Sequence, residues 1–260
     1  MSEHPPAADS VAAFYDHLAG EYHLLFADWD RAVRRQGEIL DRLIAARLGP
    51  PPRRVLDCSC GIGTQAIGLA ERGYAVHGTD LSADAVERAA REAARLGVTL
   101  TTGVADLRHL EQVGGTYDVV LTCDNALPHL LTDDDLRQAA RGMLEKLHPG
   151  GLLVASIRDY DRLLAERPRA DTPRVFDAPA GRRIVFQVWD WQPDAPRYTV
   201  QHFIVTDASG AWQTSHVSTV YRALRRDELS GILADVGFRE ITWLMPEESG
   251  YYQPIVTART

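Results

Sequence analysis

The sequence lacks the features that mark secreted and membrane proteins. Only three of its 260 residues are cysteine, an odd number that forms no disulfide framework and fits a reducing cytoplasm. No apolar run approaches the length that spans a bilayer, so we expect no membrane association. The opening stretch, MSEHPPAADS, lacks the basic start and apolar core of a signal peptide. We therefore expect a cytoplasmic protein.

Positive charge is also scarce. The chain has 28 Lys and Arg residues against 36 Asp and Glu residues, which gives a formal net charge of −8. An acidic protein repels phosphate backbones, and no block of basic residues reverses this. We therefore expect no nucleic-acid partner and favour a small-molecule partner. The totals leave open whether the protein is a monomer or a homo-oligomer.

What the sequence does contain is a regular alternation of strand-like and helical segments. Buried strands separated by amphipathic helices imply parallel pairing through right-handed crossovers. We therefore predict an α/β fold with a doubly wound, mostly parallel, seven-stranded Rossmann-like sheet. The first five strands are predicted at 53–59, 74–80, 98–106, 117–125 and 149–159. Helices between them are predicted at 63–73, 83–97 and 132–148. Ser82 is predicted to cap the helix at 83–97.

The flanking segments have other patterns. Residues 1–10 are rich in proline, alanine and polar residues and are predicted to be a disordered leader. Residues 11–50 have helical periodicity and are predicted to form a helical cover, followed by the main domain at 51–260. Long alternating segments at about 173–224 predict an antiparallel β insert after the fifth strand. One helix at 225–238 and two strands at 239–245 and 251–259 are predicted to complete the chain.

Acidic residues end the first three predicted strands. Asp57, Asp80 and Asp106 hold these positions, and Gly61 and Gly63 follow the first of them. In a doubly wound sheet the ligand lies beyond the carboxyl ends of the strands, where glycines let the backbone approach it closely. Asp80 can accept hydrogen bonds from both hydroxyls of a ribose. Asp106 can accept one from the exocyclic amine of an adenine.

Two kinds of ligand fit this arrangement, a dinucleotide and S-adenosylmethionine. A dinucleotide site favours G-x-G-x-x-G, whose pyrophosphate lies on a helix N-terminus. Here the loop reads D-C-S-C-G-I-G-T and begins with an acid, which repels a pyrophosphate and attracts the α-ammonium group of a methionine moiety. The charge favours S-adenosylmethionine, with S-adenosyl-L-homocysteine as product, over the plainer interpretation that these acids are turn residues and solvated strand ends.

With these residues in view, the sequence resembles the class I S-adenosylmethionine-dependent methyltransferases. Within that class it is similar to the glycine and glycine/sarcosine N-methyltransferases from Phe14 onward. The similarity rests on VLDCSCGIGTQAIGLAERGYAV, GTDLS, CDNALPHL, PGGLLVASIRDYD and YYQPIVTAR. The resemblance implies methyl transfer from S-adenosylmethionine to the amine of a small carboxylate-bearing substrate like glycine or sarcosine.

The resemblance also implies which residues contact the cofactor. They come from the N-terminal helices, the strand ends and the loops after them, and Arg35 is a candidate partner for the carboxylate of the cofactor. The set is Tyr22, Trp29, Arg35, Asp57, Gly61, Gly63, Asp80, Leu81, Asp106, Leu107 and Cys123.

For the substrate, the resemblance implies a role for Arg158 as the residue that binds its carboxylate. This role also makes physical sense, because an arginine at the carboxyl end of a central strand faces the ligand crevice, where an unpaired guanidinium is costly. A carboxylate can be bound there by two parallel hydrogen bonds. The alternative is that Arg158 pairs with Asp159, Asp161 or another acid and braces the loop.

Other substrate residues are less distinctive. Asn125 and His129 match the substrate-contacting pair of the resembled family, although His129 is equally well explained as a structural histidine with satisfied hydrogen bonds. Tyr198 and Tyr221 lie on the insert and could reach the amine, but aromatic residues on alternating strands are usually core residues.

The three cysteines give no sign of a metal site, and two other functions fit the sequence. C-S-C at 58–60 is too tight for tetrahedral zinc, so we expect no metal site and small buried cysteines. One rival function is a small-molecule N- or O-methyltransferase of secondary metabolism. A second is a non-catalytic cofactor-binding or scaffold protein. A nucleic-acid methyltransferase is disfavoured, because DNAL replaces the (D/N)-P-P-(Y/F) tetrad that amino-methylating enzymes of that kind carry.

Overall fold

The computed structural model describes residues 10–178, 181–193, 195–208 and 210–260. The predicted leader therefore lies outside the described residues except for Ser10. The hydroxyl of Ser10 accepts a hydrogen bond of 3.2 Å from the Ala13 N–H and caps the first helix, so this residue belongs to that helix.

The central sheet has seven strands in the order β10-β11-β5-β4-β1-β2-β3. Strands β1 to β5 pair in parallel, whereas β11 is antiparallel to both of its neighbours, which confirms the predicted α/β doubly wound, mostly parallel fold. Val55, Leu56 and Val120 have no solvent exposure, as expected for parallel strands covered on both faces. The strands are β1 (Arg54–Asp57), β2 (Ala75–Asp80), β3 (Thr101–Val104), β4 (Tyr117–Thr122), β5 (Leu147–Ser156), β10 (Arg239–Leu244) and β11 (Ile255–Arg259).

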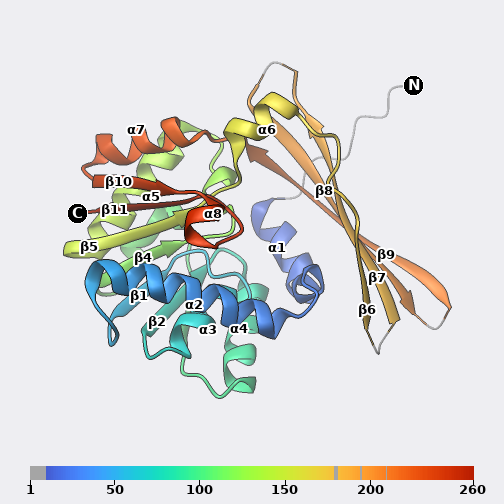
Figure 1. Cartoon of the computed structure of the whole chain (residues 1–260), viewed down its shortest axis with the longest axis horizontal. Coiled ribbons are helices and arrows are strands. Elements are labelled where there is room, and N and C mark those ends of the chain that lie inside the picture. Colours follow the sequence, from blue (N-terminus) through green and yellow to red (C-terminus); the bar gives the residue numbers. More distant parts are fainter. Residues whose placement is uncertain (1–9, 179–180, 194, 209) are drawn as a thin grey trace.

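Helices connect these strands and cover the sheet (Figure 1). Ser82 caps α4 as predicted, by accepting a hydrogen bond of 3.0 Å from the Ala85 N–H. In the described part of the chain, none of the helices is both long enough and apolar enough to cross a bilayer. The helices after β1 are α3 (Thr64–Ala70), α4 (Ala83–Arg95), η2 (Leu107–Gln112), η3 (Leu127–His129), α5 (Asp133–Lys146), α6 (Tyr160–Glu166), α7 (Arg226–Val236) and α8 (Pro246–Ser249).

The N-terminal helices divide between two positions. They are α1 (Val11–Ala19), η1 (Tyr22–Leu25) and α2 (Trp29–Leu48). Leu40 and Ile44 of α2 pack against the central sheet, and a close approach between Gly37 and Gly68 joins α2 to α3. Figure 1 shows α1 between the central sheet and the second sheet. Helices α1 and η1 therefore lie over the carboxyl ends of the strands, whereas α2 packs along the sheet and reaches this end with residues such as Arg35 and Gln36.

The second sheet contains four antiparallel strands in the order β6-β7-β8-β9. It consists of β6 (Arg174–Ala178), β7 (Gly181–Trp191), β8 (Arg197–Ala208) and β9 (Ala211–Arg222), and Figure 1 shows it standing beside the central sheet. Val185, Ile204 and Val217 project from its inner face and pack against Phe14 and Leu18 of α1. The insert and the N-terminal helix thus bury each other and enclose the space above the strand ends.

Candidate active site

The carboxyl ends of β1, β2 and β4 surround a cavity of about 460 Å³, which we call the strand-end cavity. Its wall is formed by the loop between β1 and α3, the residues after β2 and β4, and the first turns of the N-terminal helices. Predicted cofactor residues in this wall are Tyr22, Gly61, Asp80, Leu81, Leu107 and Cys123. The structure therefore brings these six side chains and backbone positions together around one space.

The loop between β1 and α3 depends on its glycines. Gly61 has a φ of +51° and Gly63 a φ of +92°, in the left-handed region where a side chain is strained. A Cβ atom on Gly63 would lie 2.8 Å from Cδ1 of Ile67, so the turn into α3 accepts no side chain there. The loop backbone can consequently pass close to a ligand in the strand-end cavity.

Asp57 lies directly behind this loop and does not itself line the cavity. It is 1% exposed, its Oδ1 atom accepts a 3.3 Å hydrogen bond from the Ser59 N–H, and its Oδ2 atom has no partner. Burial raises the pKa of Asp57 to about 8, against the effect of that hydrogen bond, and the charge of Asp80 adds to the rise. A buried carboxylate oxygen without a partner favours a ligand that brings a cation or a hydrogen-bond donor.

Asp80 lines the cavity and fixes the loop. Its carboxylate accepts hydrogen bonds of 2.8 Å from the Gly61 N–H and 3.0 Å from the Ser82 N–H. Burial raises the pKa of Asp80, while these two backbone donors act in the opposite direction. The carboxylate is thereby held at the end of β2 with Leu81 beside it in the cavity wall.

Asp106, predicted to contact an adenine, already has a partner. Its Oδ2 atom lies 2.6 Å from Nη2 of Arg108, and its Oδ1 atom accepts a 2.8 Å hydrogen bond from the Arg108 N–H. Burial raises the pKa of Asp106, but the hydrogen bonds from Arg108 outweigh it and hold the pKa below its usual value. Arg108 and Leu107, rather than Asp106, line the strand-end cavity.

The three predicted residues of the N-terminal helices occupy different places. Tyr22 reaches the cavity, whereas Trp29 is buried beside the glycine loop and donates a 3.0 Å hydrogen bond from Nε1 to Oγ1 of Thr64. Arg35 is exposed and lines a second space. Trp29 therefore positions the start of α3, and Arg35 lies outside the wall of the strand-end cavity.

The second space, which we call the intersheet cavity, is about 990 Å³ and lies between the ends of β4 and β5 and the inner face of the second sheet. Arg158 projects into it from the end of β5. Its guanidinium donates hydrogen bonds of 2.8 Å to the Tyr198 hydroxyl and 3.1 Å to Oε1 of Gln187. Its Cζ atom lies 4.9 Å from the ring centre of Trp189 and 5.4 Å from that of Tyr221.

These contacts place neutral groups around a positive charge. No carboxylate of the described residues forms an ion pair with Arg158. Asp159 and Asp161, the acids weighed as alternative partners, instead bind Arg226 at 2.7 Å and 3.2 Å. The guanidinium is therefore fixed in direction with no carboxylate at ion-pair distance, although its charge opposes the rise in the pKa of both Asp124 and Asp171 in the same cavity. An anionic ligand in the intersheet cavity would supply a closer partner.

Asn125 and His129 each leave one polar atom free. Oδ1 of Asn125 accepts 3.0 Å hydrogen bonds from the Arg158 N–H and from the Tyr160 hydroxyl, while Nδ2 is buried without a partner. Nε2 of His129 lies 2.9 Å from the Tyr15 hydroxyl, and Nδ1 has no partner. Burial, followed by the charge of Arg158, lowers the pKa of His129 to about 3, so the imidazole is neutral near pH 7.

One residue of the site was missed by the sequence reasoning. Asp124 lines both cavities, and its Oδ2 atom accepts a 2.6 Å hydrogen bond from the Tyr22 hydroxyl. Its position at the end of the fourth predicted strand, like that of Asp57 and Asp80 in theirs, was the available signal. The three cysteines are free and buried, as predicted.

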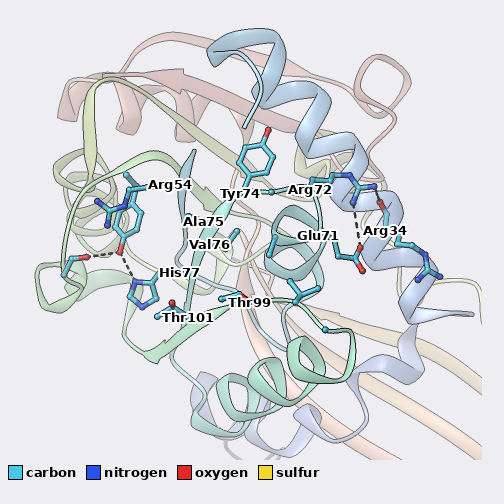
Figure 2. Close-up of a pocket in the computed structure, with 16 residues that line it drawn as sticks. Arg34, Arg54, Glu71, Arg72, Tyr74, Ala75, Val76, His77, Thr99 and Thr101 are labelled. Atoms are coloured by element: carbon cyan, nitrogen blue, oxygen red, sulfur yellow. Dashed lines mark hydrogen bonds and ion pairs between the residues drawn. The ribbon is translucent and has the colours of Figure 1, made fainter. Parts of the chain in front are cut away.

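The largest hollow of the three lies elsewhere. Figure 2 shows this 1180 Å³ space near the amino ends of β1 and β2, with Arg54, Arg72 and His77 at its margin. These side chains are already engaged. Arg72 binds the Gly68 carbonyl at 2.8 Å, His77 lies 2.8 Å from the Tyr117 hydroxyl, and Arg54 lies over the Tyr117 ring. Size alone therefore does not identify the functional site, because doubly wound sheets bind ligands at the carboxyl ends of their strands and this space lies at the amino ends.

Comparison with known proteins agrees with this geometry. A family model described as a methyltransferase domain matches residues 55–151. A glycine/sarcosine N-methyltransferase of Parasynechococcus marenigrum (strain WH8102) is 34% identical over 157 residues, which cover 57% of this chain and 55% of that protein. A protein of the same name from Aphanothece halophytica is 25% identical over 259 residues, covering 92% of this chain and 87% of that protein. The first of these matches thus spans about half the length of the relative.

A solved structure extends the comparison to the fold of the whole chain. The S-adenosylmethionine-bound CalS10 of Micromonospora echinaspora, an amino pentose methyltransferase, matches with a TM-score of 0.72 and 19% sequence identity. The match covers 99% of this chain and 100% of that chain. The two proteins therefore share a fold over nearly the whole length of both chains.

Proposed function

We propose that this chain, which matches a methyltransferase domain at residues 55–151, transfers the methyl group of S-adenosylmethionine to the amine of a small carboxylate-bearing substrate such as glycine or sarcosine. The observation that carries this proposal is Arg158. Its guanidinium lies in a cavity next to the strand-end cavity and has no acidic partner among the described residues. A substrate carboxylate supplies the missing counter-charge.

In this proposal the cofactor occupies the strand-end cavity. Gly61 and its neighbours contact the methionine part, and its ammonium group lies against the loop in front of Asp57, whose buried Oδ2 atom has no partner. Asp80 and Leu81 bind the ribose, and Leu107 packs on the adenine, with Asp106 shared between its Arg108 partner and the base. The sulfonium and ammonium groups are cationic, which matches a wall that contains buried acids.

The protein residues act by orientation. When bound, S-adenosylmethionine supplies a methyl group that the positive sulfur already activates. Arg158 and Asn125 fix the substrate in the intersheet cavity so that its nitrogen approaches the methyl carbon in line with the carbon–sulfur bond. Alignment of this kind accounts for roughly 7–11 kcal/mol of a reaction barrier. Helix α1 and η1 cover both cavities and exclude water from the reacting atoms.

One observation favours a second candidate, a small-molecule N- or O-methyltransferase that acts on a larger substrate. The intersheet cavity is about 990 Å³, more than glycine fills, and Trp189 and Tyr221 present aromatic surface within it. The solved neighbour with the same architecture is named an amino pentose methyltransferase. An amino sugar would use this aromatic surface and leave Arg158 without a counter-charge.

Labelled S-adenosylmethionine tests both candidates in one experiment. The purified protein is incubated with glycine, sarcosine, dimethylglycine, a panel of uncharged amines and a panel of amino sugars, and the labelled products are separated. We expect label in the carboxylate-bearing amines. Label confined to uncharged amines or amino sugars contradicts the proposal and supports the second candidate.

A further inference from the structure

Asp124 is the acid that the two cavities share. Three residues line both of them, Tyr15, Tyr22 and Asp124, and only Asp124 bears a carboxylate. Throughout the described ranges, no Lys, Arg or His forms an ion pair with it. Its carboxylate accepts a short hydrogen bond from the neutral Tyr22 hydroxyl and a long one, 3.5 Å, from Nε2 of Gln253. The boundary between the two cavities thus contains an acid with no ion-pair partner among the described residues.

The backbone is strained to place this carboxylate. Asp124 has a φ of +59° and Asn125 a φ of +69°, in the left-handed region that residues other than glycine rarely adopt. Hydrogen bonds fix the pair, since the Asp124 N–H donates to Oγ of Ser156 at 2.8 Å and the Asn125 N–H donates to its carbonyl at 3.1 Å. Strain held by surrounding contacts is found most often at functional sites.

Arg158 faces the same intersheet cavity with the opposite charge. Burial raises the pKa of Asp124, and both the Tyr22 hydroxyl and the charge of Arg158 act in the other direction. Neither Asp124 nor Arg158 has an ionic partner among the residues described. An acid and a guanidinium in one cavity, neither with a partner at ion-pair distance, match one ligand that carries both an anionic and a cationic group.

We propose that Asp124 binds the ammonium group of the substrate and accepts its proton before methyl transfer. This inference rests on the proposed function. The site then selects zwitterionic amino acids, with the carboxylate on Arg158 and the nitrogen on Asp124. Because Asp124 is the acid that also lines the strand-end cavity, the nitrogen it binds lies on the side of the substrate nearest the cofactor.

The step balances in atoms and charge. A proton passes from the substrate ammonium group to an oxygen of Asp124 and leaves a neutral amine. The nitrogen lone pair forms the bond to the methyl carbon while the carbon–sulfur bond breaks and its electron pair stays on sulfur. The products are an N-methylammonium group, a neutral thioether and protonated Asp124, which returns its proton to solvent when the product leaves.

Binding measurements on matched ligands test this role. Protein saturated with S-adenosyl-L-homocysteine is titrated by calorimetry with glycine and with propionate, which has the same carboxylate and size but no nitrogen. For Asp124→Asn we expect glycine affinity to fall roughly 10-fold or more, the loss of a charge-assisted hydrogen bond, with propionate affinity little changed. Glu247→Gln removes an exposed acid from the rim of the same cavity and serves as the control, with both affinities retained.

A second variant covers the case in which asparagine disturbs the fold. Asp124→Gly removes the carboxylate and suits the φ of +59°, so it retains cofactor binding and shows the same selective loss of glycine. Unchanged glycine affinity in either folded variant overturns the role of Asp124, as does an equal loss of glycine and propionate. Failure of the wild-type protein to bind either ligand instead overturns the proposed function.

Discussion

In the proposed function, Arg158 recognises the carboxylate end of the substrate. Its two hydrogen bonds to Tyr198 and Gln187 orient the guanidinium, and both partners are uncharged. The sequence predicted this role from the position of Arg158 after a central strand. It also named Tyr198 and Tyr221 as residues that could reach the amine. It did not predict Gln187 or Trp189, because these lie on β7, far from Arg158 in the chain.

For Arg158→Ala we expect the KM for the amine substrate to rise roughly 10- to 150-fold, the range for losing a hydrogen-bonded charge. The Kd of S-adenosylmethionine should change little, because Arg158 lines the intersheet cavity and not the strand-end cavity. Steady-state kinetics and calorimetry measure the two quantities. A parallel loss of both affinities contradicts the assigned role.

The raised pKa of Asp57 leads us to expect that cofactor binding depends on pH. Its pKa of about 8 in the free protein means that the neutral carboxyl stabilises the unliganded fold at low pH, and this contribution is lost as the pH rises through 8. A cationic ammonium group needs the ionised form. The Kd of S-adenosyl-L-homocysteine should therefore fall as pH rises from 6 to 8, by up to about tenfold per pH unit, with release of a proton.

Calorimetry in two buffers of different ionisation enthalpy detects that proton. Asp57→Asn provides the control, since it keeps the size of the side chain and removes the titration, so its Kd should be flat over the same pH range. A wild-type Kd that does not vary with pH would show that Asp57 stays neutral when the cofactor binds.

At the scale of elements, the strands and long helices of the central sheet were predicted because their periodicity is strong. The elements that were missed are short. Strand β6 falls within the predicted insert but was not resolved as a separate strand, and its residues Arg174, Val175 and Asp177 are exposed. The short helices η2 and α6 have six and seven residues. Their positions depend on tertiary contacts, such as the β6–β7 ladder, and local sequence carries little of that information.

The N-terminal region shows a similar limit. Helical periodicity over 11–50 was read as one cover, but the structure separates α1 and η1 from α2. Periodicity shows that a helix has an apolar face and not which surface that face meets. The sequence therefore did not distinguish Tyr22, which lines the strand-end cavity, from Trp29 and Arg35 on α2, which do not line it.

The contact between α2 and α3 gives a prediction about stability. A Cβ atom on Gly68 would lie 2.5 Å from the Val33 carbonyl oxygen and 2.9 Å from Cα of Gly37, so Gly68→Ala forces the helices apart. We expect a loss of about 1–3 kcal/mol in the free energy of unfolding, measured by urea titration. Gly231→Ala in α7 meets nothing within 4 Å and should raise stability slightly through helix propensity.

At the scale of the whole molecule, two sheets and an N-terminal helix enclose a pair of adjoining cavities. A ligand that binds this closed arrangement and not the unfolded chain must raise the melting temperature. At one hundred times its Kd, S-adenosyl-L-homocysteine should add about 2.7 kcal/mol. For a chain of this size that is a rise of roughly 5–10 °C in Tm.

Thermal denaturation with several ligands measures this effect. NAD⁺ at the same concentration should produce no shift, because its pyrophosphate would meet Asp57 and Asp80 instead of a free helix N-terminus. A shift with the dinucleotide and none with the sulfur nucleoside would contradict the assignment of the strand-end cavity.

The central claim is that one enclosed crevice binds the cofactor on one side of the Tyr22–Asp124 pair and an amino acid on the other. A crystal structure of the ternary complex with S-adenosyl-L-homocysteine and sarcosine tests it most directly. We predict the thioether sulfur in the strand-end cavity, the sarcosine carboxylate on Arg158 and its nitrogen within hydrogen-bond distance of Asp124. Sarcosine bound with its carboxylate away from Arg158, or the nucleoside bound outside the strand-end cavity, would contradict the account.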